Sequence, residues 1–386
     1  GIDIGTSGVR VAALDEQREV CGSAACPFRD RQENADPAAW WRGIEKCFED
    51  LRRDLSLSGI AAIAVDGTSG TVLAIDRANG PVGRALMYDE ASPDLALVAQ
   101  LEAVAPADSP ALGKQSPLAR AAFLARQPNV ARIVHQADWV AMRLGDGQPI
   151  GDENNALKTG YDLAEGRWPD WISEAGIDIA RLPEIVPAGT PICRVGSRAR
   201  ALGLPSSALL VSGTTDGCAS FLATGADRVG EAVTALGSTL VLKLLSDREI
   251  KATRFGVYSH RIKGMWLAGG ASNTGGAVIR AYFPDERLAE LSAQLDPDAP
   301  TGLNYYPLLH PGERFPVSDA KLAPRLEPRP REDATVFQGI LEGIAAIEKE
   351  GYERLAELGA QPLKSVRSVG GGASNAAWTR MRQRLI

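Results

Sequence analysis

The chain has 386 residues, more than a single hydrophobic core usually organises, so two domains are expected. Hydrophobic residues make up 45% and charged residues 23% of the chain, and no apolar run is long enough to span a membrane, so we expect no membrane partner. The formal net charge is −6 with dispersed lysines and arginines, which argues against nucleic acid as a partner because backbone phosphates need a concentrated basic face.

Cysteines and histidines lack the spacing of a metal site. The chain has three widely separated histidines, and its five cysteines form no C-x-x-C pair: Cys21, Cys26, Cys47, Cys193 and Cys218. This pattern predicts a reducing compartment and no zinc centre. The first residues, GIDIG, read directly into a strand and not into a secretory or transit segment, so we expect a cytoplasmic protein.

The N-terminal part alternates strand and helix patterns. β-Branched runs predict strands at residues 1–4, 9–14 and 61–65. Apolar residues at helical spacing predict a helix over residues 37–55, with Asp36 as its N-cap and its tryptophans in the core. The alternation favours the α/β class.

A Gly- and Thr-rich turn beside an apolar strand recurs along the chain. It appears in IDIGTSGVRVAALD, AVDGTSGTVLAID, SGTTDGCAS and TALGSTLVLKLLS. The recurrence predicts an internally duplicated architecture. Each such turn can present backbone N–H groups to an anion.

Two of these turns carry an acid. Asp3 and Thr6 lie in the first turn, where a carboxylate, a hydroxyl and free N–H groups suit Mg²⁺ together with a nucleotide phosphate. Asp216 lies where a loop is expected to become helical around Gly217, and a helix start favours the ionised carboxylate. A purely structural turn and a simple N-cap are the alternatives.

The C-terminal part offers two further glycine-rich segments. Gly237, Ser238 and Thr239 lie between two predicted strands and can face terminal phosphates, the alternative being a plain hairpin. Residues 298–334 predict an irregular surface segment, followed by a helix over 336–358 and a strand over 366–369. In GGGASNAAW, the glycines permit close approach of a base or ribose.

Taken in order, these motifs resemble one family over nearly the whole chain. The initial acidic turn, DGTSGT, GTTDG, LGST, LAGGASNTGG and GGGASNAAW are similar to the FGGY carbohydrate kinases. The resemblance implies a two-lobed actin-like ATPase (ribonuclease H-like) fold of the α/β class, with ATP and sugar in the interdomain cleft. It implies a sugar and Mg/phosphate domain at residues 1–222 and an ATP-binding domain at 223–386, in which the family's final strand and helix are expected to be missing.

The acceptor region points to a particular branch. The runs VDGTSGTVLAIDRANGPVGRALMYDEASPD and NALKTGYD resemble the short bacterial and plant D-ribulose kinases, also described as xylulose kinase-like. The implied reaction moves the γ-phosphate of ATP to the C5 hydroxyl of D-ribulose, with D-xylulose as the alternative. Ser69 and Gly70 replace the Arg-Glu pair of glycerol kinases. The family's aromatic-x-Asp-x-Arg pattern is altered at residues 88–92, where Glu90 and Ser92 stand at the Asp and Arg places.

The resemblance also implies roles for individual residues. Asp3 and Asp216 would hold Mg²⁺, and Asp216 would act as general base. The ketose would be positioned by Asp216 and Ser69 with the main chain of Ser7 and Gly8. ATP would be bound by a larger set: Thr6, Gly237, Ser238 and Thr239 at the phosphates, Gly371, Asn375 and Trp378 at adenosine, and Gly269 and Gly270 in the same pocket.

Two other classes of protein share parts of this pattern. An actin- or chaperone-like ATPase switch would use the nucleotide motifs without phosphorylating a sugar. A sugar-binding protein would hold ketose and ATP without making ADP. The expected partners are a small-molecule sugar and ATP, and the pattern specifies no oligomeric state.

Overall fold

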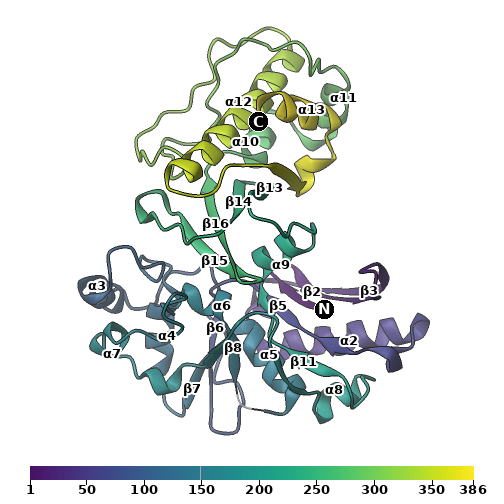
Figure 1. Cartoon of the computed structure of the whole chain (residues 1–386), viewed down its shortest axis with the longest axis vertical. Coiled ribbons are helices and arrows are strands. Elements are labelled where there is room, and N and C mark those ends of the chain that lie inside the picture. Colours follow the sequence, from purple (N-terminus) through teal and green to yellow (C-terminus); the bar gives the residue numbers. More distant parts are fainter. Residues whose placement is uncertain (148) are drawn as a thin grey trace. The chain divides into compact units, whose positions relative to one another are not determined.

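The computed structural model describes residues 1–147 and 149–386, which divide into two compact units, Gly1–Ala219 and Ser220–Ile386 (Figure 1). The division falls inside α9 (Asp216–Leu222), whereas the boundary expected after residue 222 coincides with the end of that helix. Each unit contains its own five-stranded sheet. None of the described helices has the length and apolar character needed to cross a membrane.

The sheet of unit 1 combines an antiparallel meander with parallel strands. Its order is β12-β5-β1-β2-β3, in which β1 pairs with β5 and β5 with β12 in parallel. The meander runs antiparallel from β1 to β2 to β3. The strands are β1 (Ile2–Gly5), β2 (Gly8–Leu14), β3 (Val20–Pro27), β5 (Val65–Gly67) and β12 (Thr214–Thr215).

Helix α2 (Pro37–Asp54) packs along β2 and β3 (Figure 1). Asp36 caps it by accepting the N–H of Ala38 at 2.9 Å, as predicted. Trp40 is fully buried, and its ring meets Trp139 edge-on with 6.0 Å between centroids. The packing role expected of the helix tryptophans is therefore confirmed for Trp40.

A second core in unit 1 surrounds a separate pair of strands. AVDGTSGTVLAID does form two strands, but β6 (Val72–Ile75) pairs with β7 (Arg132–His135) and not with β5. All four residues of β6 are buried. A strand of this kind is covered by other elements on both of its faces. Helices around this core include α3 (Leu95–Val104), α4 (Pro117–Ala125) and α7 (Trp171–Glu174).

The remaining elements of unit 1 are mostly short, and the helix over residues 136–145 is largely buried in the core around Trp40. They are α1 (Arg31–Asn34), η1 (Leu57–Gly59), β4 (Ala62–Ile63), α5 (Gln136–Gly145), β8 (Ile150–Asp152), α6 (Glu153–Leu157), η2 (Ile179–Arg181), β9 (Glu184–Val186), β10 (Pro191–Arg194), α8 (Ser197–Ala201) and β11 (Leu209–Val211).

Unit 2 repeats the plan of unit 1. Its sheet has the order β15-β16-β14-β13-β17, with an antiparallel meander and one parallel pair, β13 with β17. The predicted duplication is therefore confirmed at the level of sheet topology. The strands are β13 (Glu231–Leu236), β14 (Leu240–Ser246), β15 (Tyr258–Ile262), β16 (Met265–Ser272) and β17 (Ser365–Val369).

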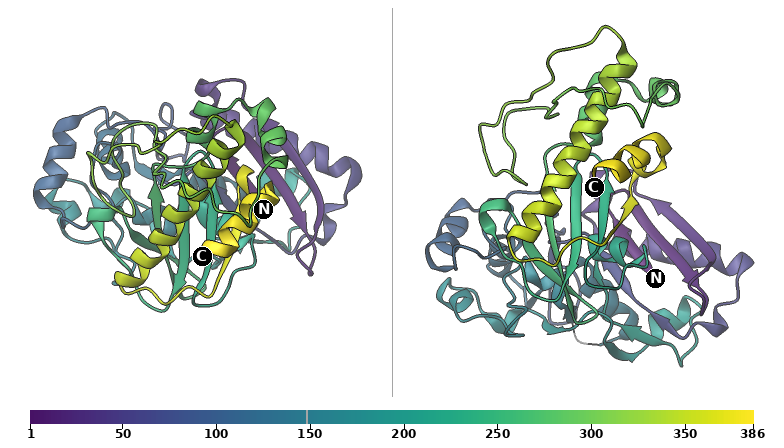
Figure 2. Two further views of the ribbon diagram at one scale, coloured as in Figure 1. Left: turned by 90° about the horizontal axis from the view of Figure 1, so that it is seen from above. Right: turned by 45° about the horizontal axis from the view of Figure 1, so that its top comes forward.

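The long helix α12 (Asp333–Glu357) packs beside this sheet and beside α13 (Ala376–Leu385), as Figure 2 shows. Its Gly351 leaves no room for a side chain, because a Cβ there would lie 2.8 Å from Leu242 and 2.9 Å from Phe315. The expected irregular segment is observed, since residues 299–332 contain no helix and only isolated β-bridges. The other elements are η3 (Thr253–Phe255), α10 (Gly276–Tyr282), α11 (Asp285–Ala293) and η4 (Gly371–Ser374).

A buried ion pair joins α12 to α13. Arg382 donates to both carboxylate oxygens of Glu348 at 2.6 Å, and both side chains are almost completely buried. Thr234 of β13 donates to the same carboxylate and also bonds the Tyr352 hydroxyl. The pair is therefore fully hydrogen-bonded, which is the condition under which a buried ion pair is tolerated.

We expect Arg382→Met to lower the free energy of unfolding of unit 2 by about 3–5 kcal/mol, because Glu348 would keep a buried charge without its partner. Arg380→Met is the matched control on the same helix, since its ion pair with Asp298 is exposed and should contribute less than about 1 kcal/mol. Chemical denaturation of the full chain measures both. Equal losses in the two variants would contradict this assignment.

Candidate active site

Three acids of unit 1 gather where parallel strands end. In β1 and β5, Asp3 and Asp66 are register partners, and Thr214 of β12 is the partner of Asp66 on its other side. Asp216 directly follows β12 as the first residue of α9. The two predicted acids therefore come from strands on either side of β5, and Asp66 lies on β5 between them. We call these three acids the Asp66 edge.

Asp66 lies in an unusual environment. Its Oδ1 is buried and has no hydrogen-bond partner within the described part of the chain. Burial, followed by the nearby Asp3 and Asp216 carboxylates, raises the pKa of Asp66 to about 8. At neutral pH this group therefore holds a proton, which keeps three adjacent carboxylates from carrying three charges.

The β1–β2 turn lies beside these acids. Arg10 donates to Asp3 at 2.9 Å and to the Ser7 hydroxyl at 2.8 Å. Gly8 must be glycine, since a side chain there would run into the main chain of Cys26. Thr6 and Ser7 are exposed at the tip, where their main chain can meet a ligand.

The next turn carries Ser69 and is fixed from one side by buried polar groups. Gln136 accepts from the N–H and the hydroxyl of Thr68, both at 2.9 Å, and Thr68 Oγ1 lies 2.6 Å from Thr71 Oγ1. The Ser69 hydroxyl is itself buried and makes no hydrogen bond to any described residue. A rigid turn thus presents a hydroxyl that a polar ligand could satisfy.

Strand β12, which leads to Asp216, is supported by a buried asparagine. Asn154 donates to the Thr214 hydroxyl at 3.1 Å and is completely buried. Its helix, α6, is capped by Asp152, which accepts the N–H groups of Asn154 and Asn155. A steric limit acts on the same strand, because a side chain at Gly213 would overlap the carbonyl oxygen of Val65.

Unit 2 contains a cavity of about 870 Å³ between the β13–β14 turn, α11 and α13. Gly237 and Ser238 line it from the turn, and Gly371 lines it from the GGG segment. Arg280 of α10 also lines it and donates to the Ser238 hydroxyl at 2.8 Å. The cavity is large enough for a nucleotide-sized ligand, and its turn end carries a hydroxyl, that of Ser238, and a cation, Arg280.

Asn375 and Trp378 lie on the α13 wall of this cavity. Asn375 caps α13 by accepting the N–H of Trp378 at 2.9 Å and donates to Ser292 of α11 at 2.9 Å, so it ties the two walls together. Trp378 is only 3% exposed and donates its indole N–H to the Leu341 carbonyl at 3.1 Å. Much of its ring therefore serves packing within unit 2.

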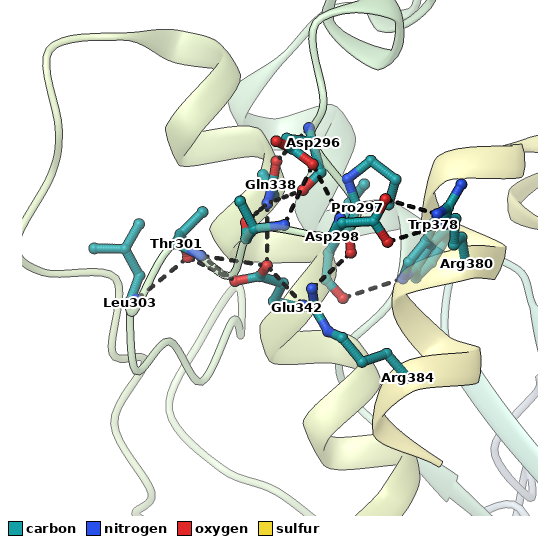
Figure 3. Close-up of polar contacts among 12 residues, drawn as sticks. Asp296, Pro297, Asp298, Thr301, Leu303, Gln338, Glu342, Trp378, Arg380 and Arg384 are labelled. Atoms are coloured by element: carbon teal, nitrogen blue, oxygen red, sulfur yellow. Dashed lines mark hydrogen bonds and ion pairs between the residues drawn. The ribbon is translucent and has the colours of Figure 1, made fainter.

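A polar network joins α12 to the segment that follows α11 and to α13 (Figure 3). Gln338 of α12 donates to the Asp296 and Ala299 carbonyls at 2.8 and 2.7 Å. Glu342, one turn further along α12, accepts from Thr301 and from Arg384 of α13. The segment that follows α11 and the helix α13 are thus fastened to the same stretch of α12.

Three residues expected at the ATP site do not line the larger cavity of unit 2. Gly269 and Gly270 of β16 line a separate cavity of about 160 Å³ with Tyr258 and His260, not the larger one. The reason is packing: a side chain at Gly270 would lie 2.7 Å from the Phe315 ring, so this glycine makes room for the core. Thr239 is exposed in the β13–β14 turn but does not line the larger cavity.

Sequence reasoning missed three polar residues at these sites: Asp66, Arg10 and Arg280. Asp66 stands inside the DGTSGT motif, so its place in that glycine-rich turn was the available signal, whereas the pairing of its strand with that of Asp3 appears only in the structure. Arg10 reaches Asp3 because the two residues are partners across β1 and β2. Arg280 reaches the cavity because α10 packs beside the β13–β14 turn, where it bonds Ser238. The sequence carries no local pattern for either contact.

Mg²⁺ is the metal expected from the sequence at Asp3 and Asp216. Among residues 1–147 and 149–386, no group of three or more His, Cys, Asp or Glu side chains is arranged to hold a metal ion. Mg²⁺ commonly binds through one or two carboxylates plus substrate phosphates and water. The Asp3–Asp66–Asp216 edge, with the unpartnered Asp66 oxygen, is compatible with that mode.

The similar sheets of the two units are those of an actin-like ATPase fold. Solved structures agree: a xylulose kinase from Rhodospirillum rubrum superposes with a TM-score of 0.84 at 22% identity, covering 99% of this chain and 83% of that one. The ADP-bound glycerol kinase of Plasmodium falciparum gives a TM-score of 0.82 at 17% identity, covering 99% and 83%.

The sequence comparisons identify the family. The N-terminal domain of the FGGY family of carbohydrate kinases matches residues 1–93, and its C-terminal domain matches residues 233–382. The chain belongs to this family and is a carbohydrate kinase. Among its relatives are the xylulose kinases of Escherichia coli K12, 24% identical over 99% of this chain and 83% of the relative, and of Bacillus subtilis 168, 22% identical over 99% and 82%.

We expect Ala289→Trp to raise the KM for ATP about tenfold or more, because Ala289 lines the cavity from α11 and an indole would occupy ligand space. Glu290→Trp is the control, since it adds the same ring at the neighbouring exposed position outside the lining. Steady-state kinetics with varied ATP measures both. An unchanged KM in Ala289→Trp would show that the nucleotide binds elsewhere.

We expect Asp66→Asn to flatten the pH dependence of stability between about pH 4 and pH 8. A raised folded-state pKa means that the acid stabilises the fold fully below its unfolded pKa of about 4 and loses that contribution as pH rises through about 8. The slope removed can reach about 1.4 kcal/mol per pH unit. Urea unfolding at a series of pH values, followed by tryptophan fluorescence, measures it; parallel curves for both proteins would refute the raised pKa.

Proposed function

We propose that this carbohydrate kinase transfers the γ-phosphate of ATP to the C5 hydroxyl of a ketopentose, with D-ribulose as first choice. The observation that carries the proposal is the buried Ser69 hydroxyl, which lacks a hydrogen-bond partner among the described residues. Ser69 lies in the turn that directly follows β5, the strand of Asp66. A sugar hydroxyl would satisfy the Ser69 hydroxyl. Ser69 and Gly70 also replace the bulky charged pair of glycerol kinases, which suits a longer acceptor.

The chemistry assigned to unit 1 is proton removal. Asp216 is exposed and accepts the N–H of Gly217 at 2.6 Å, which orients its carboxylate. It takes the proton of the C5 hydroxyl while that oxygen bonds to the γ-phosphorus and ADP departs with the bridging oxygen. The products are the sugar phosphate, ADP and one proton.

The γ-phosphate charge requires cations and N–H donors. Mg²⁺ held by Asp3 and Asp216 would neutralise part of the negative charge on the γ-phosphate. Arg10, which now pairs with Asp3, can turn its guanidinium to a phosphate when a metal takes the carboxylate. In unit 1, Thr6 would contact a phosphate. In unit 2, the β13–β14 turn with Ser238 and Arg280 would bind phosphates, and the cavity would bind the adenosine.

D-xylulose is the second candidate acceptor. It differs from D-ribulose at one carbon, and the relatives named above are xylulose kinases. In the altered acceptor segment, Ser92 stands at the family's Arg place and is 5% exposed, and Glu90 is engaged by Arg84 at 2.8 Å. A site that hydrogen-bonds sugar hydroxyls can separate two epimers by leaving one polar group unpaired.

We expect strong stimulation of ADP release by D-ribulose in a coupled assay with Mg·ATP, weaker stimulation by D-xylulose, and little by L-ribulose, glycerol or no sugar. Comparison of kcat/KM for the two D-pentuloses ranks them. A preference for D-xylulose would replace the first choice, and sugar-independent ATP hydrolysis would favour an ATPase switch.

In the same assay, Asp216→Ala should lower kcat by about 10² to 10⁴-fold, the usual contribution of a positioned general base. Asp227→Ala, an exposed acid just beyond α9, is the control and should keep its rate. A near-normal kcat in folded Asp216→Ala would remove this residue as the base.

A further inference from the structure

Arg120 of α4 is a buried cation with an unusual set of partners. Its side chain is among the largest that are fully buried in the protein, at 1% exposure. It donates through Nη2 to the Gly70 carbonyl at 2.7 Å and through Nη1 to the Glu90 carbonyl. Among the described residues, no carboxylate forms an ion pair with it, and its Nε has no partner.

The carboxylates that could neutralise Arg120 are directed elsewhere. Glu90 turns its side chain to Arg84 at 2.8 Å and to the Met87 N–H at 3.0 Å, while Asp89 pairs with Arg31 at 2.9 Å. Burial consequently dominates and lowers the pKa of Arg120 to about 10. A guanidinium in such a place is costly, and an apolar side chain of similar size would fill the same space.

The two carbonyls that Arg120 holds belong to the acceptor region. Gly70 follows Ser69 and has φ +94°, a left-handed conformation that aims its carbonyl toward α4. Glu90 lies in the altered segment at residues 88–92. Gln136 fixes the Ser69 turn from one side, and Arg120 fixes it from the other.

We propose that Arg120 is a positioning residue for the acceptor sugar: its buried guanidinium fastens the Ser69–Gly70 turn to the residue 88–92 segment, so that the Ser69 hydroxyl is held in place for a sugar hydroxyl. The inference rests on the proposed function, in which Ser69 contacts the acceptor. Arg120 itself touches no substrate. The expected signature is therefore weaker acceptor binding with nucleotide binding intact.

The kinetic test uses the full chain with Arg120→Ala and the acceptor selected by the sugar panel. The KM for the sugar should rise about tenfold or more, while the KM for ATP stays within about twofold, because the ATP cavity lies in unit 2. Arg181→Ala is the matched control: Arg181 also donates to a main-chain carbonyl of unit 1, that of Ala125 at 2.8 Å, but does not contact the acceptor turn. An unchanged sugar KM, or equal increases in both KM values, would overturn the proposal.

Chemical rescue distinguishes positioning from general support of the fold. Guanidinium at about 20 mM, too dilute to unfold most proteins, should lower the sugar KM of Arg120→Ala severalfold by occupying the vacated space. It should not help Arg120→Met, whose side chain fills that space, or Arg181→Ala. Equal effects on all three variants would refute a specific guanidinium role.

Hydrogen exchange provides a measure that does not depend on activity. Amides of residues 67–71 and 86–92 should exchange faster in Arg120→Ala than in the parent protein, with the rest of unit 1 unchanged. Should Arg120→Ala fail to fold, Arg120→Lys keeps the charge but cannot span both carbonyls, and should show the same local change. If no sugar stimulates ADP release, the proposed function fails, whereas unaltered exchange in these two segments would refute the Arg120 inference by itself.

Discussion

The parallel register of β5 with β1 and β12 is the constraint on which the unit 1 site depends. It sets Asp66 beside Asp3 and beside the strand that ends at Asp216. Three acids at one sheet edge repel one another, and burial of Asp66 resolves this by keeping one of them protonated. Because Gly213 has no side chain, β12 can approach Val65 closely enough to hold that register.

Unit 2 uses buried charge differently, to fasten helices. Glu348 and Arg382 join α12 to α13, and Glu342 and Gln338 join α12 to the segment that follows α11. Both walls of the cavity are thus attached to one long helix, and Asn375 with Ser292 closes the connection across them. A pocket fixed in this way needs little ordering when a nucleotide binds.

The turn that carries Ser69 is held by buried polar groups at both of its ends. Gln136 and Thr71 hold one side of it with neutral hydrogen bonds, whereas Arg120 holds the other with a buried cation. The buried Ser69 hydroxyl in this turn has no hydrogen-bond partner among the described residues. Such a group favours a polar ligand that can reach it, and it disfavours one that cannot.

Local sequence determined the elements and the residues that act through their own turn. Asp36 caps α2 and Asn375 caps α13 because a short polar side chain reaches only its neighbouring N–H groups. The recurring glycine-rich turns likewise predicted an internally duplicated architecture, and the order of the motifs predicted the family. Only the tertiary structure placed Asp66 between two other acids, brought Arg120 to Gly70 across 50 positions, and directed Gly269 and Gly270 to another cavity. These contacts join residues far apart in the chain, and they follow from strand register and helix packing, for which one sequence carries no local signal.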